Sequence, residues 1–133
     1  MPQIFVSVRE KTPKPWGSDE WDWRERLAEE AKKVRASHPK VEQLPNSGKT
    51  IEFGVQIVFL MKADKLGRAD LDNLAKPVLD TLFRPRNAQV KDKDKYTGAL
   101  FNNVDDDRVF KLKLEKKLVS TEKAAGVDVT IDW

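Results

Sequence analysis

The sequence predicts a single α+β domain: a mixed sheet of about four strands with two main helices packed on it. Its 133 residues are enough for one hydrophobic core, and neither an internal repeat nor a second domain is visible. Segments with the alternating apolar pattern of strands are interspersed with two segments in which apolar residues recur at helical spacing. The domain is therefore expected to span residues 1–133.

The first part of the chain predicts a strand, a rigid loop and a helix. Residues 3–8 are apolar and β-branched, as strands are. Residues 11–17 include two prolines, and each disfavours helical backbone at the residue before it, so this segment is expected to be extended. Residues 19–37 carry a core-facing stripe at helical spacing, with Ser18 as the expected N-cap and Pro39 after the end.

The middle of the chain predicts a central strand and an amphipathic helix. Residues 50–61 alternate strictly at first and then become apolar on both faces, which fits a strand inside a covered sheet. A basic connection, 62–68, leads to residues 70–83, whose apolar side chains follow the i, i+3, i+4, i+7 pattern of a helix with one buried face.

The last part predicts a long loop and two strands. Residues 84–103 form a charged insert without a clear period, and loops of that length in a compact domain are usually functional or disordered. Residues 109–118 and 127–133 alternate as strands do. In the first of these strands, the apolar side chains are expected to face inward: Phe110, Leu112 and Leu114.

Composition narrows the class of protein. The chain has no cysteine, no apolar run of membrane-spanning length and no signal-peptide pattern at its start. We therefore expect a cytoplasmic protein that does not associate with a membrane. The net charge of +3 is modest, but basic residues gather in two segments, 84–95 and 111–123. Concentrated positive charge suits a polyanion such as nucleic acid, although a solvated surface explains either segment equally well.

Acidic residues lie at the starts of two predicted elements, one helix and one strand. Asp70 and Asp72 lie where the second helix should begin, and residues 105–107, all aspartates, precede a strand. Carboxylates are ligands that Mg²⁺ prefers, and acids from separate elements can converge on one ion. Lys76 follows Asp72 by one helical turn and could reach a phosphate near that ion. The pattern fits metal-assisted phosphodiester cleavage.

Simpler interpretations of the same residues remain open. Asp70 could be only a helix cap, Asp72 could pair with Lys76 at i, i+4 spacing, and residues 105–107 could be a turn. Tryptophans could stack on unpaired bases, but burial in the core is the more common use of such residues, least so for the one in the proline loop. The tryptophans concerned are Trp16, Trp21 and Trp23.

Two motifs resemble those of the RusA family of Holliday junction resolvases. The first is R-x-D-x-D-N-x-x-K-x-x-x-D over residues 68–80, and the second is D-D-x-x-V over residues 105–109. The resemblance implies a RusA-like α+β fold and a homodimeric endonuclease that requires Mg²⁺, for which Mn²⁺ substitutes. It implies paired symmetric nicks in four-way (Holliday) junctions and binding of branched DNA, in recombination and repair inside a bacterial or phage-infected cell.

The resemblance also assigns roles to residues. Asp70, Asp72 and Asp106 would be the metal-binding catalytic acids, Lys76 the functional lysine, and Asp105 a neighbouring ligand. The register leaves open which acid of residues 105–107 is the main ligand. The insert at 84–103 is longer than the connection typical of the family. The expected DNA-binding residues are Lys62, Arg68, Asn73, Lys76, Arg84, Arg86, Lys91, Lys93 and Lys95.

Two other functions fit the same composition. A DNA-binding protein without nuclease activity would use its acids only as caps and salt-bridge partners, and its DNA binding would be indifferent to Mg²⁺. A divalent-metal enzyme acting on a small phosphorylated substrate is the weaker alternative.

Overall fold

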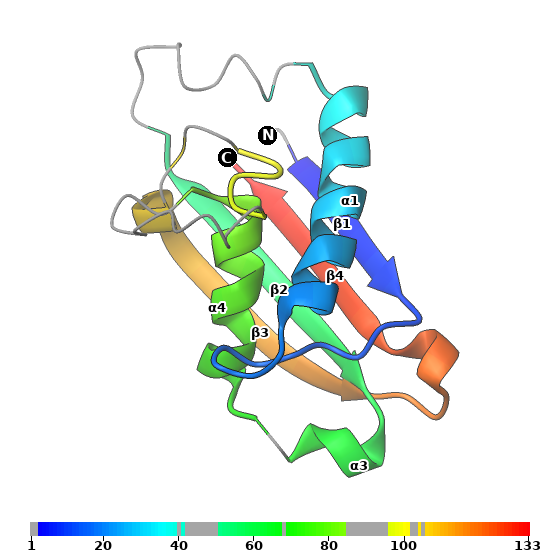
Figure 1. Cartoon of the computed structure of the whole chain (residues 1–133). Helices are drawn as coiled ribbons and strands as arrows, with labels where there is room; N and C mark the ends of the chain where they lie inside the picture. Colours follow the sequence, from blue (N-terminus) through cyan, green and yellow to red (C-terminus); the bar gives the residue numbers. More distant parts are fainter. Residues whose placement is uncertain are drawn as a thin grey trace.

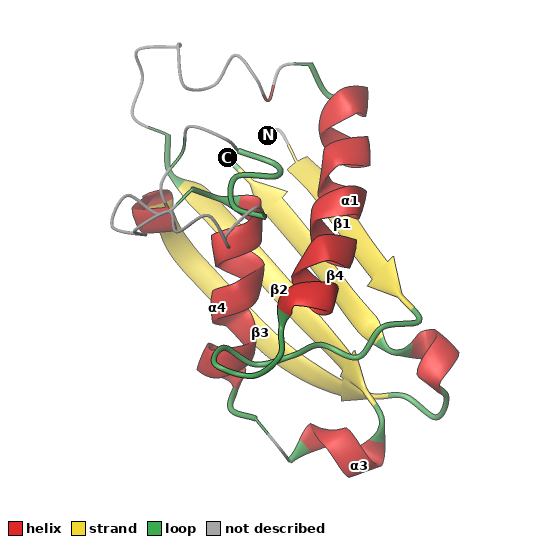
Figure 2. Cartoon of the chain, viewed as in Figure 1, coloured by secondary structure: helices red, strands yellow, loops and turns green. Residues whose placement is uncertain are grey.

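Four strands form one mixed sheet, and two long helices cover one of its faces (Figure 1 and Figure 2). The computed structural model describes residues 3–39, 41, 51–67, 69–84, 96–101, 104 and 106–133. This arrangement confirms the predicted fold class. In chain order, the strands and α-helices are β1 (Gln3–Arg9), α1 (Trp21–Ser37), β2 (Phe53–Met61), α3 (Ala63–Leu66), α4 (Leu71–Leu82), β3 (Val109–Leu118) and β4 (Gly126–Asp132).

The order of the strands decides where the ends of α4 lie. The order is β1-β4-β2-β3, with β4 antiparallel to both of its neighbours and β2 parallel to β3. Parallel neighbours cannot be joined by a hairpin, so the chain returns along the sheet through α4. The helix therefore begins near the ends of β2 and β3 and finishes near their starts, as Figure 1 shows.

The core lies between the sheet and the two long helices. The alternate β2 residues from Phe53 to Met61 are buried, as the pattern predicts, and Val127, Val129 and Ile131 of β4 are buried beside them. Burying one large apolar side chain contributes about 1.5–3 kcal/mol, so these inward-facing strand residues dominate the stability of the sheet. Some predicted boundaries shift: β2 starts at Phe53, and β4 already starts at Gly126.

Part of the predicted charged insert belongs to the core. Leu100 and Phe101 are buried, and the ring of Phe101 lies 5.1 Å from that of Phe83, centroid to centroid. Backbone bonds from Gly98 to Phe83 and from Ala99 to Thr81 satisfy carbonyls at the end of α4. Residues 96–101 form no helix or strand, as predicted for the insert, but residues 98–101 are buried and pack with the core instead of forming part of a disordered loop. Residues 85–95 lie outside the described part of the chain.

The start of α1 is not capped by Ser18, contrary to expectation. The N-cap position belongs to Glu20, and the Ser18 hydroxyl instead donates to the Pro15 carbonyl at 2.7 Å. The Glu20 carboxylate accepts the backbone N–H of Gly17 at 3.0 Å. A hydrogen bond within the turn therefore replaces the expected cap, because Ser18 is already part of the turn that closes the proline loop.

The prediction that Phe110 and Leu112 face a core is wrong in one respect. Leu112 pairs with the buried Val55, so its side chain points to the helix-covered face, whereas the pairing shifts register between Phe53 and Gly54 and leaves Phe110 without a partner on β2. However, Phe110 remains 59% exposed and Leu112 43% exposed. Among the described residues, β3 is the last strand on its side of the sheet and lies at the margin of the helix layer, so its apolar face is only partly covered.

A buried polar contact joins the two long helices. The side chains of Arg24 in α1 and Thr81 in α4 are both buried, and the Arg24 Nε donates to the Thr81 hydroxyl at 2.8 Å. That hydroxyl donates in turn to the Pro77 carbonyl at 2.7 Å. Glu20 lies 3.7 Å from the Arg24 guanidinium and balances its charge.

We expect Thr81→Val to lower the free energy of unfolding by about 1–3 kcal/mol, because it leaves a buried guanidinium N–H without its acceptor. Urea denaturation measures this difference. The control is Thr12→Val, which removes an exposed hydroxyl bonded to Glu122 at 2.7 Å and should change stability by less than about 0.5 kcal/mol. Equal effects of the two substitutions would contradict the role given to Thr81.

Candidate active site

The two acids at the start of α4 are exposed and unpaired within the described part of the chain. Asp70 occupies the N-cap position with extended backbone, yet its side chain makes no capping hydrogen bond. Asp72 lies in the first turn and is also exposed, and the described residues give neither carboxylate a hydrogen bond or an ion pair. Lys76 pairs with Asp80 at 3.4 Å and not with Asp72. Capping and i, i+4 pairing therefore do not explain these acids.

A proline inside α4 attaches the proline loop to this helix. Pro77 has no N–H, so the carbonyl of Asn73 lacks its usual helical donor. The backbone N–H of Trp16 donates to that carbonyl instead, at 2.9 Å. The loop that precedes α1 is thereby held against the first turn of α4, beside Asp72.

The three tryptophans that precede or begin α1 differ in their surroundings. Trp23 is fully buried, as expected of a packing residue, and Trp21 is 39% exposed with the Arg24 guanidinium over its ring. Trp16 is 57% exposed, and the Lys76 ammonium lies 5.7 Å from its ring centroid. An exposed aromatic ring beside a cation and two acids is therefore part of the surface at the start of α4.

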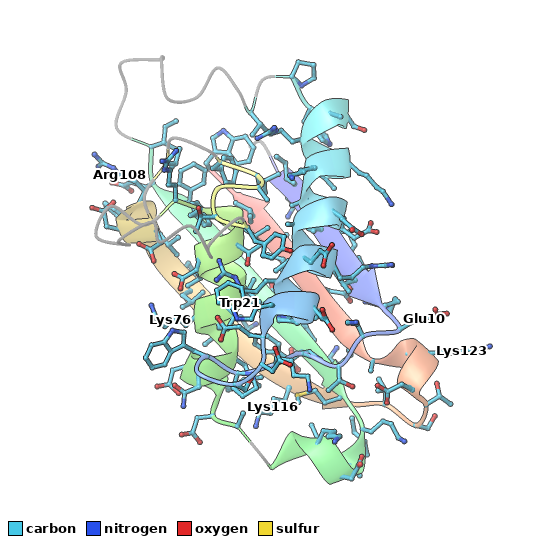
Figure 3. The ribbon with its side chains drawn as sticks, viewed as in Figure 1. Glu10, Trp21, Lys76, Arg108, Lys116 and Lys123 are labelled. Atoms are coloured by element: carbon cyan, nitrogen blue, oxygen red, sulfur yellow. The ribbon has the colours of Figure 1, made fainter. Side chains whose placement is uncertain are left out.

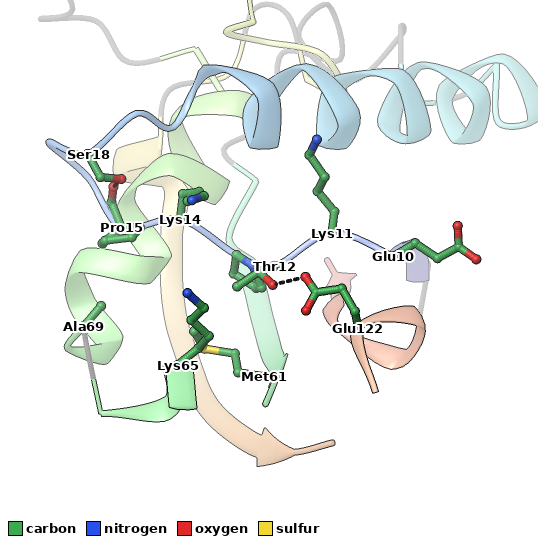
Figure 4. Close-up of a pocket in the computed structure, with 11 residues that line it drawn as sticks. Glu10, Lys11, Thr12, Lys14, Pro15, Ser18, Met61, Lys65, Ala69 and Glu122 are labelled. Carbon is green, nitrogen blue, oxygen red and sulfur yellow. Dashed lines mark hydrogen bonds between the residues drawn. The ribbon is translucent and has the colours of Figure 1, made fainter. Parts of the chain in front are cut away.

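A cavity of about 550 Å³ lies next to this surface (Figure 4). Ala69, the residue before Asp70, lines it, and a hydrogen bond between Thr12 and Glu122 crosses one wall. Three lysines that the sequence analysis did not single out also line it. They come from the proline loop and α3, so only the fold brings them together: Lys11, Lys14 and Lys65.

The described DNA-binding candidates are spread over both ends of α4. Asn73 is exposed in its first turn, and Lys62, at the N-cap of α3, is half-buried. Arg84 is exposed just after the helix, where its backbone N–H donates to the Val104 carbonyl at 2.9 Å. The other candidates lie outside the described residues: Arg68, Arg86, Lys91, Lys93 and Lys95.

The start of α4 lies near the end of β3. The Lys116 ammonium, close to the end of that strand, donates to the backbone carbonyls of Leu66 and Ala69. Figure 3 shows Lys116 toward one end of the molecule and Arg108 toward the other, with Lys76 between them. Asp70 and Asp72 are therefore fixed at the former end.

Asp106 lies at the opposite end of α4. It opens the 3-10 helix Asp106–Arg108, directly before β3, whose first residue, Val109, pairs with Phe53. The ring of Phe53 lies 5.6 Å from that of Phe83, at the end of α4. A helix of 12 residues spans about 18 Å, so this distance separates the two acidic groups along the helix axis.

One ion cannot bridge that separation. Mg²⁺ holds its ligand oxygens at about 2.0–2.1 Å, so two carboxylates on one ion approach within about 4 Å. Among the residues that the structure describes, no three acidic, histidine or cysteine side chains lie close enough to hold a metal. Contrary to expectation, a single chain therefore does not bring Asp106 to Asp70 and Asp72. Asp105 lies outside the described residues.

The sequence was compared with known protein families and with curated proteins, and neither comparison found a relative. Over the described ranges, the structure contains no helix of the length and apolar character needed to cross a bilayer.

We expect Gly17→Ala to loosen the proline loop, because Gly17 has φ +87°, where a side chain strains the backbone by about 1–2 kcal/mol. Hydrogen exchange of the Trp16 amide, measured by NMR, should become about 5- to 30-fold faster. The control is Gly67→Ala, at φ −91°, where an added Cβ likewise meets nothing within 4 Å and should leave this amide unchanged. Unchanged exchange in the Gly17 variant would show that the loop is held in another way.

Proposed function

We propose that this chain is a Mg²⁺-dependent, structure-specific endonuclease that resolves four-way DNA junctions by paired symmetric nicks. It would act as a homodimer in recombination and repair, in the cytoplasm of a bacterial or phage-infected cell. The observation that carries the proposal is the pair Asp70 and Asp72, exposed and without capping or ion-pair partners among the described residues, at the start of α4. The pair lies within the motif that resembles the RusA resolvases.

The donor chemistry at the start of α4 fits a hard divalent cation. Mg²⁺ usually takes one or two carboxylates and keeps waters or phosphate oxygens in its other positions, which suits two exposed acids. When bound, such an ion lowers the pKa of a coordinated water and stabilises charge on the phosphate. Asp70 and Asp72 would hold it, and Mn²⁺ would substitute.

The neighbouring residues would bind and orient the DNA. Lys76 carries a positive charge one turn beyond Asp72, where it would offset negative charge on the scissile phosphate. Lys14 and Lys65, in the adjoining cavity, would bind further phosphates of the backbone. The exposed ring of Trp16 offers a stacking surface for a base that is unpaired at the branch point.

Asp72→Asn should reduce Mg²⁺-dependent cleavage of a labelled four-way junction by about 100-fold or more, because a direct metal ligand is lost. Binding of the junction in Ca²⁺ should persist or tighten, since one negative charge near DNA is removed. The control is Asp64→Asn, an exposed acid in the first turn of α3, which should cut normally. Normal cleavage by the Asp72 variant would refute the assignment.

The wild-type assay also separates the rival functions. A junction and a linear duplex of equal length are incubated with and without Mg²⁺, and the nicks are mapped on each strand. A DNA-binding protein without nuclease activity would shift the junction in a salt-dependent manner and cut neither substrate. If the chain is instead an enzyme for a small phosphorylated substrate, a nucleotide should inhibit its hydrolysis of that substrate, and the junction should not.

Trp16→Ala should weaken junction binding by about 5- to 100-fold, the loss of one stacked base, and leave duplex binding unchanged. Stability should change little, because the ring is 57% exposed. Phe5→Ala, which removes a ring that is 54% exposed on the distant strand β1, is the matched control. Fluorescence anisotropy at fixed salt measures both affinities. An equal loss on duplex and junction would argue against base stacking.

A further inference from the structure

The cavity beside the start of α4 has two walls that the chain's own hydrogen bonds hold in place. The proline loop forms one wall, and the bond from the Thr12 hydroxyl to the Glu122 carboxylate, at 2.7 Å, ties it to the segment before β4. The turn between α3 and α4 forms the other wall, where the Lys116 ammonium donates to the Ala69 carbonyl. Because both walls are fixed, a ligand that enters this cavity loses little affinity to ordering of the protein.

Two lysines lie at one end of this cavity, on the left of Figure 4. Lys14 and Lys65 come from opposite walls and lie there with Ala69, the residue before Asp70, whereas Lys11 points toward α1. Within the described part of the chain, neither Lys14 nor Lys65 has an ion pair or a side-chain hydrogen bond. Like charges repel, and an anionic group between them relieves that repulsion. This end of the cavity therefore suits a phosphate group.

The rest of the lining suits a flat organic group with N–H donors. Pro13 and Met61 contribute apolar surface, and Glu10 and Glu122 lie toward the end away from the two lysines (Figure 4). One carboxylate oxygen of Glu122 accepts the Thr12 hydroxyl, which leaves the other oxygen as an acceptor. Carboxylates accept hydrogen bonds from the N–H groups of bases and repel phosphate. The cavity therefore has a cationic end, apolar sides and an accepting end.

The size of the cavity agrees with a ligand that uses both ends. Its volume is about 550 Å³, far more than a lone phosphate ion occupies. Pockets for small organic ligands usually measure about 300–1,000 Å³ and combine apolar walls with a few polar groups that fix the orientation of the ligand.

We propose that this cavity binds a single nucleotide, with its phosphate between Lys14 and Lys65 and its base toward Glu122. The nucleotide is a free one or one unit of a DNA strand that has left the base stack, as nucleotides do in enzymes that act on extruded bases. Only the DNA source rests on the proposed nuclease function. In that case the phosphate lies at the end of the cavity next to Asp70, so the extruded nucleotide holds its strand at the metal-binding acids.

This site is distinct from the exposed ring of Trp16. A base on that ring stacks on an aromatic surface, whereas none of the described residues that line the cavity is aromatic. A fluorescent base therefore behaves differently in the two places, because it is quenched when stacked and bright among aliphatic side chains.

The site is tested by titrating the wild-type chain, without divalent metal, with 2′-deoxyadenosine 5′-monophosphate and recording amide NMR spectra. The amides of Thr12, Lys65 and Ala69 should shift saturably. Inorganic phosphate and 2′-deoxyadenosine should each bind at least about 10-fold more weakly, because each keeps the contacts of one end only. Absence of a saturable shift at these amides overturns the proposal, and so does equal affinity for phosphate and nucleotide.

Lys65→Ala should weaken binding of the nucleotide by about 10-fold or more, the loss of one charge-assisted hydrogen bond. The control is Lys123→Ala, which removes an exposed lysine that follows Glu122 in the chain and points away from the molecule in Figure 3. It should bind as wild type does. The spectrum of each variant before titration shows whether the fold is kept. Equal nucleotide affinities of the two folded variants overturn the role of Lys65.

The source of the nucleotide is tested with four-way junctions that carry 2-aminopurine at successive positions around the branch point, in Ca²⁺. If the ligand is a unit of DNA, one position should brighten with wild type, should brighten about 5-fold less with Lys65→Ala, and should lose its signal when excess mononucleotide is added. If the mononucleotide binds in the cavity and no position brightens, the site serves a free nucleotide.

These readouts separate the inference from the proposed function, because nucleotide binding is measured without metal and without cleavage. A chain that binds the mononucleotide and leaves the junction uncut rejects the nuclease and keeps the site. A chain that cuts the junction and does not bind the mononucleotide keeps the nuclease and rejects the site.

Discussion

The parallel pairing of β2 with β3 constrains the rest of this molecule. Two adjacent parallel strands require a connection that returns along their full length, and α4 is that connection. The residues at the two ends of α4 are held apart by the length of this rigid helix. The acids of the candidate site stand at those ends, so the same topology that buries the core also divides the site within one chain.

A second contact determines which surface surrounds the first pair of acids. Pro77 removes one helical hydrogen bond, and the Asn73 carbonyl that it frees accepts the amide of Trp16. A proline within a helix normally costs stability, but here the unused carbonyl binds a loop from a distant part of the chain. The loop brings an exposed aromatic ring and the lysines of the adjoining cavity to the start of α4. The candidate site is therefore broader than the motif at residues 68–80.

Much of this fold follows from local sequence patterns. The alternation in residues 50–61 and the helical spacing in residues 70–83 predict β2 and α4, because burial of one face demands those periods. The charge pattern also indicated Asp70 and Asp72 as unusual for a helix start. Local pattern did not predict that residues 98–101 are buried, because they cover the end of α4 and join an aromatic cluster whose other members come from distant segments.

The sequence by itself determined the periodicity of each helix and strand, the acidic residues at the starts of α4 and β3, and the absence of cysteine. Only the tertiary structure decided the order of the strands. That order makes β3 an edge, leaves Phe110 and Leu118 exposed, and sets Asp106 at the far end of α4 from Asp72. The physical reason is that alternation specifies which face a side chain takes, whereas its burial depends on which neighbour the strand acquires. Neighbours are chosen by the packing of the whole chain.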